Sequence, residues 1–333
     1  MSDYYGTYGQ KVQYLSSDPP APQTGQVWYN YTSATLKVRS TNATAVWTSA
    51  ASIPMAISGM AFTGTQTAGI AYGGATPASP SPTTAVNNAY LHNGSTWTAT
   101  GSLGTARYTI SRFGTQTTAV AGSGAVGGSV TNTENFNGST WTASGNVGTA
   151  RDQGGGAGTQ TAGIIAGGFN QAANTAITNV EIYNGSSWTA TTSLPTRRTI
   201  YNCSGGPQTA TITYGGYEGG PTGGPNSVLT QSFNGSTWTT LNNLNTVRRG
   251  SAGSGTTSSA WYAGGSTPST SETEYYNGTS WAISTAMPTA WTSAGTGTGI
   301  NGQIVGGANP SLTAQSFFWN GVGSAGTRTV TVS

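Results

Sequence analysis

Charged side chains are scarce in this sequence. Asp, Glu, Lys and Arg make up 6% of its 333 residues, with 11 basic residues against 8 acidic ones, and no run of Lys or Arg exceeds two. Binding to a nucleic acid normally requires a dense basic patch. We therefore expect no nucleic-acid partner, and we expect water to contact mainly the hydroxyls and amides of Thr, Ser and Asn.

Cysteine and histidine occur once each, as Cys203 and His92. A single cysteine forms no intramolecular disulfide and no multi-cysteine metal site. Cys203 has no acid-base partner nearby in the sequence, so we expect a small buried side chain that only fills space. We accordingly expect neither a metal nor another cofactor.

Long hydrophobic runs are missing as well. No stretch approaches the roughly 18 apolar residues that a membrane helix needs. The first residues, 1–6, lack the basic and apolar regions of a secretory signal. We expect no membrane insertion and no export through a signal peptide.

Glycine and aromatic residues, in contrast, are plentiful and regularly placed. The stretch Tyr183-Asn184-Gly185-Ser186-Ser187-Trp188 contains an aromatic that ends one strand, an Asn-Gly turn, and a Trp that opens the returning strand. It therefore predicts a β-hairpin. Its other copies run from His92 to Trp97, Phe136 to Trp141, Phe233 to Trp238 and Tyr276 to Trp281.

The copies recur at nearly constant spacing. From Asn93 to Asn320, the steps between equivalent asparagines are 44, 47, 50, 43 and 43 residues. One four-stranded propeller blade occupies about 40–50 residues. The spacing therefore predicts an all-β protein built from β-propeller blades.

Each repeat also has an apolar strand that ends in a glycine pair. Such a pair permits a bend and a close backbone approach where a Cβ would clash. Six pairs predict six units over residues 48–326, and an Asn-Gly hairpin ends each unit. The pairs are Gly73-Gly74, Gly127-Gly128, Gly167-Gly168, Gly215-Gly216, Gly264-Gly265 and Gly306-Gly307.

The two ends of the chain suggest how the ring closes. Segments 26–30, 34–39 and 44–48 read as three strands, and the alternating Thr/Val run at 327–333 reads as one more. We predict that 26–48 and 327–333 form a seventh, composite closing blade, so that 26–333 is the propeller. The alternative is six blades with the N-terminal hairpin outside the ring.

Residues 1–25 are rich in proline near their end and predict an extended arm. The arm is either a disordered tail or a segment that docks on a neighbouring subunit. The loops after the glycine pairs vary most between repeats. Because insertions at one point of a repeat map to one face, we expect that face to contact partners.

Four arginines occupy equivalent places. Arg107, Arg151, Arg197 and Arg248 follow Trp97, Trp141, Trp188 and Trp238 by 10, 10, 9 and 10 residues. A second charge is added at two of these places by Arg198 and Arg249, and Trp291 takes the place in the next repeat. Symmetry would set them around one mouth of the central channel, where they could bind a carboxylate of an acidic glycan or peptide. The alternative is that each arginine forms a structural pair with Glu134, Glu181 or Glu274.

The apolar strand ending in Gly-Gly, the Glu two residues before an aromatic, the Trp and the later Arg together resemble the kelch repeat of β-propellers, over residues 48 to about 320. The Gly-Thr-Gln-Thr-Ala and Asn-Gly-Ser-Thr-Trp motifs are similar to motifs of kelch-like proteins encoded by marine bacteriophages. Residues 25–38 are similar to a hairpin of phage structural proteins. The resemblance implies a component of the virion.

Two enzyme families have a fold that resembles this one, and the sequence lacks the characteristic residues of both. The copper site of galactose oxidases uses two histidines and a tyrosine cross-linked to cysteine, which one His92 and a distant Cys203 do not supply. The hairpin motif vaguely resembles the Asp-box of sialidases, but the aspartate of that box is absent. We therefore expect no enzyme.

The sequence thus predicts a non-catalytic structural or adhesion protein of a bacteriophage particle, made in the host cytoplasm and located in the virion. A place in a tail or capsid fibre and a role in host attachment would fit. Its partners would be other virion proteins and a host surface glycan or protein, in an oligomeric or multi-copy arrangement. The alternatives are a glycan-specific receptor-binding protein, using the arginines or Tyr217, and a propeller glycosidase.

Overall fold

The computed structural model describes residues 12–20, 22, 26–41, 45–76, 84–202, 204–220, 223–266, 269–290, 292–297, 301–308, 312–321 and 325–330. The chain divides into two compact units. Unit 1 comprises Met1–Ala45 with Asn320–Ser333, and unit 2 comprises Val46–Trp319.

The fold is all-β. Its strands are short, and the one helical segment of the described chain is the 3-10 turn η1 (Gln208–Ala210). The part of the chain that the structure describes contains no helix with the length and apolarity that crossing a membrane would require.

Unit 2 contains six four-stranded sheets within the described residues. The first contains β5 (Ala61–Gly64), β6 (Gly69–Tyr72), β9 (Ala89–His92) and β10 (Trp97–Ala99). The second contains β11 (Ser111–Gly114), β12 (Ala119–Ala125), β13 (Ser129–Phe136) and β14 (Trp141–Ser144). The third contains β15 (Gly155–Thr159), β16 (Ala162–Ala166), β19 (Val180–Tyr183) and β20 (Trp188–Thr191).

The remaining sheets follow along the chain. The fourth contains β21 (Ser204–Gly205), β22 (Thr211–Tyr214), β23 (Thr230–Phe233) and β24 (Trp238–Thr240). The fifth contains β25 (Ala252–Thr256), β26 (Ser259–Ala263), β27 (Thr273–Tyr276) and β28 (Trp281–Ser284). The sixth contains β29 (Thr292–Gly297), β30 (Asn301–Ala308), β31 (Leu312–Asn320) and, from the start of the unit, β4 (Val46–Ala50). Two short hairpins, β7 (Ala75–Thr76) with β8 (Thr84–Ala85) and β17 (Phe169–Asn170) with β18 (Thr175–Ala176), extend from the first and third repeats.

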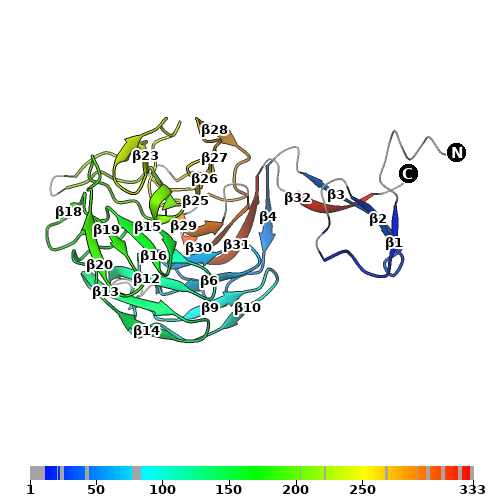
Figure 1. The fold of residues 1–333 in the computed structure, drawn as a ribbon, viewed down its shortest axis with the longest axis horizontal. Coiled ribbons are helices and arrows are strands. Elements are labelled where there is room, and N and C mark those ends of the chain that lie inside the picture. Colours follow the sequence, from blue (N-terminus) through cyan, green and yellow to red (C-terminus); the bar gives the residue numbers. More distant parts are fainter. Residues whose placement is uncertain are drawn as a thin grey trace. The chain divides into compact units, whose positions relative to one another are not determined.

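The sheets of unit 2 follow one another about a common centre (Figure 1). Their first strands contact each other in sequence, β5 with β11, β11 with β15, β15 with β21, β21 with β25 and β25 with β29, and β29 contacts β5. Hydrophobic side chains fill the space between neighbouring sheets; Ile164 of β16, Tyr214 of β22 and Tyr262 of β26 belong to one cluster. The arrangement is that of a β-propeller-like fold.

The Asn-Gly hairpins form as the sequence predicts. Tyr183 pairs directly with Trp188 across the turn, and their rings lie 4.7 Å apart. The glycine is left-handed, with φ of 102° at Gly185. The asparagine contributes through its side chain: the Oδ1 atom of Asn184 accepts the N–H groups of Ser186 and Ser187 at 3.0 and 2.9 Å.

The five repeat tryptophans also connect neighbouring repeats. The indole N–H of Trp188 donates to Thr133 of the preceding sheet, that of Trp281 to Thr230, and that of Trp238 to the carbonyl of Thr192. Trp97 donates to the carbonyl of Ala51, and Trp141 packs on Tyr72 with ring centroids 4.6 Å apart. A large ring with one donor combines an apolar contact with a hydrogen bond in four of the repeats, while the indole nitrogen of Trp141 has no hydrogen-bond partner.

A glutamine in the turn between the first two strands joins each of the first four sheets to the neighbouring sheet. The side-chain N–H groups of Gln160 donate to the carbonyls of Ala119 and Phe136 on β12 and β13 of the preceding sheet. Gln116 and Gln208 make the same two bonds in their repeats. Gln66 of the first sheet donates to the carbonyls of Gly302 and Trp319 in the sixth. This glutamine latch therefore links the first sheet to the last.

Four glycines of the predicted pairs lie where close approach requires them. Gly73 and Gly74 have φ of 63° and 104°, and Gly167 and Gly168 have 61° and 113°. A Cβ on Gly167 would stand 2.4 Å from the carbonyl oxygen of Arg198. The pair therefore packs against the arginine segment of the next repeat.

The pair predicted at Gly127-Gly128 is wrong. Ser123 and Gly124 take the equivalent place, with φ of 59° and 120°, and Ala125 forms the bridge to Tyr108 that follows the pair. A Cβ on Gly127 or on Gly128 would meet nothing within 4 Å. Because a serine occupies the first position of the bend in this repeat, a search for two consecutive glycines placed the bend at the wrong residues.

Unit 1 is one sheet with the order β1-β2-β3-β32. Strand β1 (Gln13–Leu15) lies parallel to β2 (Val27–Asn30), which is antiparallel to β3 (Thr35–Thr41). Strand β32 (Ala325–Val330) is antiparallel to β3, from Leu36 opposite Val330 to Thr41 opposite Ala325. The two ends of the chain therefore pair with each other.

The composite closing blade is corrected in one respect. Strand β4, which we expected beside β2 and β3, belongs to the sixth sheet of unit 2 and completes its fourth position. Residues 331–333 lie outside the described part of the chain. The composite sheet and the repeats therefore share no strand, because each four-stranded sheet is already complete.

Part of the predicted arm adds a strand to its own chain. Asp18 follows β1, and its carboxylate accepts hydrogen bonds from the side chains of Trp28, Asn30 and Lys37. The hydrogen bond from Lys37, followed by those from Asn30 and Trp28, lowers the pKa of Asp18 to about 2. Residues 12–20 are thereby tied to β2 and β3.

Candidate functional site

Three of the four predicted ligand-binding arginines are internal. Arg107, Arg151 and Arg248 are 0% exposed. Arg107 pairs with Glu134, and Arg151 pairs with Glu181. Arg248 pairs with Glu274 at 3.1 Å and with Glu272 at 3.0 Å. The arginines therefore do not present their guanidinium groups at a channel mouth, because carboxylates of their own repeats bind them.

Each glutamate also holds the segment that carries its arginine. The carboxylate of Glu181 accepts the N–H groups of Gly148 and Thr149 as well as the guanidinium of Arg151. Burial lowers the pKa of Arg151, and the attraction and hydrogen bond of Glu181 oppose that shift. A buried ion pair whose carboxylate also accepts backbone N–H groups is a structural lock between a repeat's entry segment and its third strand.

The fourth repeat corrects the predicted residue. Arg198, ten residues after Trp188, is 0% exposed and donates to Gln231, Thr213 and two backbone carbonyls. Arg197, which we had assigned to the set, is exposed. A uniform spacing of ten residues was the signal for Arg198. Trp291 lies outside the described residues, as does Cys203.

His92 is buried in the first hairpin. Its Nδ1 lies 3.0 Å from the carbonyl oxygen of Gln66, its ring lies 4.5 Å from that of Trp97, and its Nε2 has no hydrogen-bond partner. Burial lowers its pKa, which the hydrogen bond to Gln66 partly opposes. His92 therefore takes the packed position that Phe136 and Tyr183 hold in other repeats. Among the described residues, no three His, Cys, Asp or Glu side chains form a group that could hold a metal ion.

The chain has one face where repeats differ. In five repeats, a residue a few positions before the first strand forms an isolated β-bridge. Its partner is the residue that follows the glycine-pair position of the same repeat. The bridged residues are Ser58 with Ala75, Tyr108 with Ala125, Asp152 with Phe169, Thr199 with Tyr217, and Arg249 with Ser266. The variable loops thus lie beside the starts of the first strands. We call this the loop face.

Backbone hydrogen bonds join the repeats along the loop face. The N–H of Thr109 donates to the carbonyl of Gly59, that of Gln153 to Thr109, and that of Ile200 to Gln153, at 2.7, 2.9 and 2.9 Å. The linking residues are left-handed, with φ of 62° at Gly59, 50° at Thr109 and 55° at Gln153. A β-branched residue such as threonine rarely adopts this conformation, and such strain concentrates at functional positions.

A cavity of about 280 Å³ opens at the loop face. We call it the mouth pocket. It is lined by Thr109, Gln153, Thr199, Tyr201, Gly216, Arg249, Gly250 and Ser266. The guanidinium of Arg249 lies over the ring of Tyr217, 4.3 Å from its centroid. The pocket therefore combines one cation with hydroxyl and amide groups.

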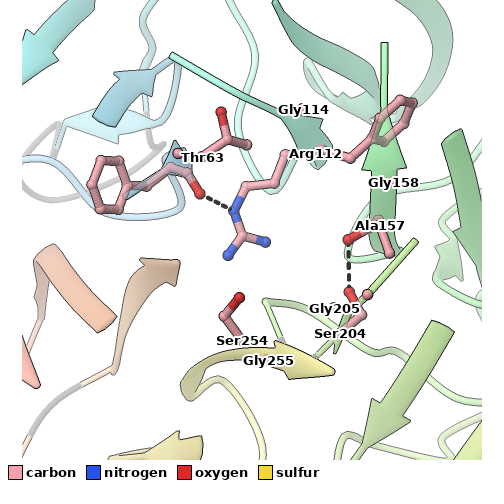
Figure 2. A pocket seen from close by; sticks show the side chains of 14 residues that line it. Thr63, Arg112, Gly114, Ala157, Gly158, Ser204, Gly205, Ser254 and Gly255 are labelled. Atoms are coloured by element: carbon pink, nitrogen blue, oxygen red, sulfur yellow. Dashed lines mark hydrogen bonds between the residues drawn. The ribbon is translucent and has the colours of Figure 1, made fainter. Parts of the chain in front are cut away.

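A second cavity, of about 160 Å³, lies at the other ends of the same first strands. Figure 2 shows the guanidinium of Arg112 pointing into it, with Nε donating to the carbonyl of Phe62 at 2.7 Å, near the hydroxyls of Thr63, Ser204 and Ser254. Arg112 carries the one charge among the described residues that line it, and it is 5% exposed. Much of the remaining wall is glycine backbone, so this cavity is narrow and polar.

Sequence reasoning named Arg249 only as a second charge beside Arg248 in the arginine set, and it missed Arg112. The signal for Arg249 was its place one residue beyond the repeating Arg248. Arg112 had no signal, since the other repeats place Phe62, Gly156 and Ser204 at its position and only the assembled ring brings these strands together.

Comparisons with known proteins agree on the fold and add nothing to the function. No protein-family model matches the chain, and no curated protein matches it. Among the solved structures that resemble it is one described as "Structure of YjhT", with a TM-score of 0.64 and 11% sequence identity. The match covers 80% of this chain and 95% of that one. At this identity the likeness shows a shared architecture alone.

Proposed function

We propose that this chain is a non-catalytic binding protein of a bacteriophage particle, built as a kelch-like β-propeller of six blades. The observation that carries the binding role is the separation of repeated from variable residues. The residues that recur between repeats, among them Trp188, Gln160 and Arg151, hold the sheets together. The bridged residues that differ between repeats gather on the loop face. Such a division is typical of a scaffold that presents a binding surface.

Two contacts support the closed six-bladed ring. The latch residue Gln66 of the first sheet donates to the sixth, and β4 supplies the fourth strand of that same sheet. Pairing strands from both ends of a repeat array in one blade removes the exposed edges that an open array would leave. On this proposal unit 1 lies outside the ring count and serves as an attachment sheet.

The virion assignment is supported by the resemblance of the repeats to kelch-like phage proteins and by a surface poor in charge. Its test is location. Quantitative mass spectrometry of density-purified particles should find the chain at a fixed, symmetry-related copy number, and antibody raised against residues 46–319 should decorate those particles in electron micrographs. A chain recovered only from the soluble fraction of infected cells, and never on particles, would contradict the proposal.

A further inference from the structure

The mouth pocket contains a cation that the fold does not use. Arg248 and Arg249 are neighbours, but Arg248 takes both nearby carboxylates, Glu272 and Glu274. No carboxylate of the described residues lies within ion-pair distance of Arg249. Its place in the other repeats is taken by Ser58, Tyr108, Asp152 and Thr199, so the architecture does not require an arginine there.

The side chain of Arg249 is held in a defined orientation. Its guanidinium lies 4.3 Å from the ring centroid of Tyr217, which occupies the bridge position of the preceding repeat. Stacking engages the face of the guanidinium and leaves its N–H donors in the plane available for a planar, two-oxygen acceptor. A carboxylate matches that arrangement of donors by forked hydrogen bonds.

The rest of the pocket supplies groups that suit hydroxylated ligands. Thr109 and Gln153 line the pocket, and both have a left-handed backbone conformation. The equivalent positions of two other repeats are the glycines Gly59 and Gly250, which adopt this conformation without strain. The amide of Gln153 is fixed by a 2.8 Å hydrogen bond to Asp152. Side chains kept at strained positions indicate that the side chains themselves are needed.

From these contacts we propose that the mouth pocket binds the carboxylate of an acidic sugar, with Arg249 as the anion-binding residue and Tyr217 as its support. The proposal rests on the binding role proposed above and names its ligand class. The volume of about 280 Å³ suits a single sugar residue at the end of a glycan or free in solution.

The test uses the full chain and titrates galacturonic acid and glucuronic acid, followed by calorimetry and by saturation-transfer NMR. Each acid is compared with its methyl ester and with the neutral parent sugar. We expect at least one uronic acid to bind, and its ester and parent to bind about tenfold or more weakly, because only the acid forms the charge-assisted pair. Uronic acid ending a short oligosaccharide is included, which distinguishes a glycan terminus from a free sugar.

Matched variants assign the effect. Arg249→Gln should lower affinity for the bound uronic acid by about tenfold or more, and Arg249→Lys should recover only part, since lysine lacks the fork. Tyr217→Ala should weaken binding, because it removes the ring on which the guanidinium of Arg249 stacks. Arg197→Gln removes an exposed arginine that does not line the pocket and should change nothing.

Three results would overturn the inference: neither uronic acid binds, the neutral sugars bind equally well, or Arg249→Gln binds with full affinity. Thermal unfolding of each variant excludes loss of folding as the cause. If the chain is found on particles but does not bind uronic acids, the proposed role in the particle stands and only this ligand class is excluded.

Discussion

At the residue scale, the buried arginines show how a charge is accommodated in an almost uncharged protein. Arg151 and Glu181 satisfy each other and two backbone N–H groups. The first repeat places Ile57 and Tyr90 at the corresponding positions, where both are buried in an apolar cluster. The lock is therefore replaceable as an apolar pair, and in the fourth repeat the amide oxygen of Gln231 takes the place of the carboxylate beside Arg198. A buried arginine at this position still requires an acceptor.

A double-mutant cycle tests this. We expect Glu181→Tyr alone to destabilise the protein by about 3–5 kcal/mol, since it leaves the guanidinium of Arg151 buried without its carboxylate. We expect a comparable loss for Arg151→Ile alone, which leaves the carboxylate of Glu181 without its guanidinium. The double variant Arg151→Ile with Glu181→Tyr, which copies the first repeat, should lose clearly less. Urea unfolding measures both, and a double variant as unstable as the sum of the single ones would contradict the pair interpretation.

His92 predicts a dependence on pH. Burial lowers its pKa in the folded state below the ordinary 6.5. The unfolded chain therefore binds the proton more readily, so stability is fully present above about pH 6.5 and declines as pH falls toward the lower folded pKa. His92→Phe, which restores the residue type of Phe136, should make this decline smaller. Unfolding free energies at pH 7.5 and pH 5.5 measure it; identical declines in the two proteins would count against the assignment.

At the element scale, the glutamine latch decides how sheets are joined. Gln66→Ala removes two side-chain donors and leaves carbonyls of β30 and β31 without them. We expect a loss of about 1–3 kcal/mol. Hydrogen exchange should rise in the first and sixth sheets. Thr67→Ala, next to it in the same turn, is the matched control and should change neither quantity.

If exchange rose in the third and fourth sheets instead, the latch of Gln66 would not be the closing contact. The fifth repeat has Thr257 in place of the glutamine. The latch is consequently absent from that turn by sequence. The indole N–H of Trp281, which donates to Thr230 of the fourth sheet, connects the fifth sheet to the sheet before it.

At the scale of the whole molecule, the division into two units has a direct consequence. No strand is shared between the composite sheet of unit 1 and the described sheets of unit 2. We expect residues 46–319 alone to fold cooperatively, with a Tm within a few degrees of the full chain. Residues 51–319, which lack β4, should melt lower because the sixth sheet loses its fourth strand. Calorimetry compares the two.

Failure of residues 46–319 to fold would mean that unit 1 contributes to the ring, as the seventh blade predicted from the sequence requires. Equal melting of the two fragments would mean that β4 does not close the sixth sheet. Each outcome therefore distinguishes one way of closing the ring from another.

The sequence by itself determined the hairpins and their repeat spacing, because these depend on local turn chemistry and strand alternation. Gly185 and Trp188, for example, form a turn and a cross-strand pair within six residues of chain, so the hairpin depends on no distant contact. The sequence also predicted that the chain's two ends pair, because both read as strands and exposed strand edges are disfavoured. Only the tertiary structure decided which arginines are internal, that β4 joins β31, and that Arg249 and Arg112 line cavities. Those outcomes depend on contacts between residues of different repeats, and the sequence pattern within one repeat does not specify which residues of another repeat a side chain will contact.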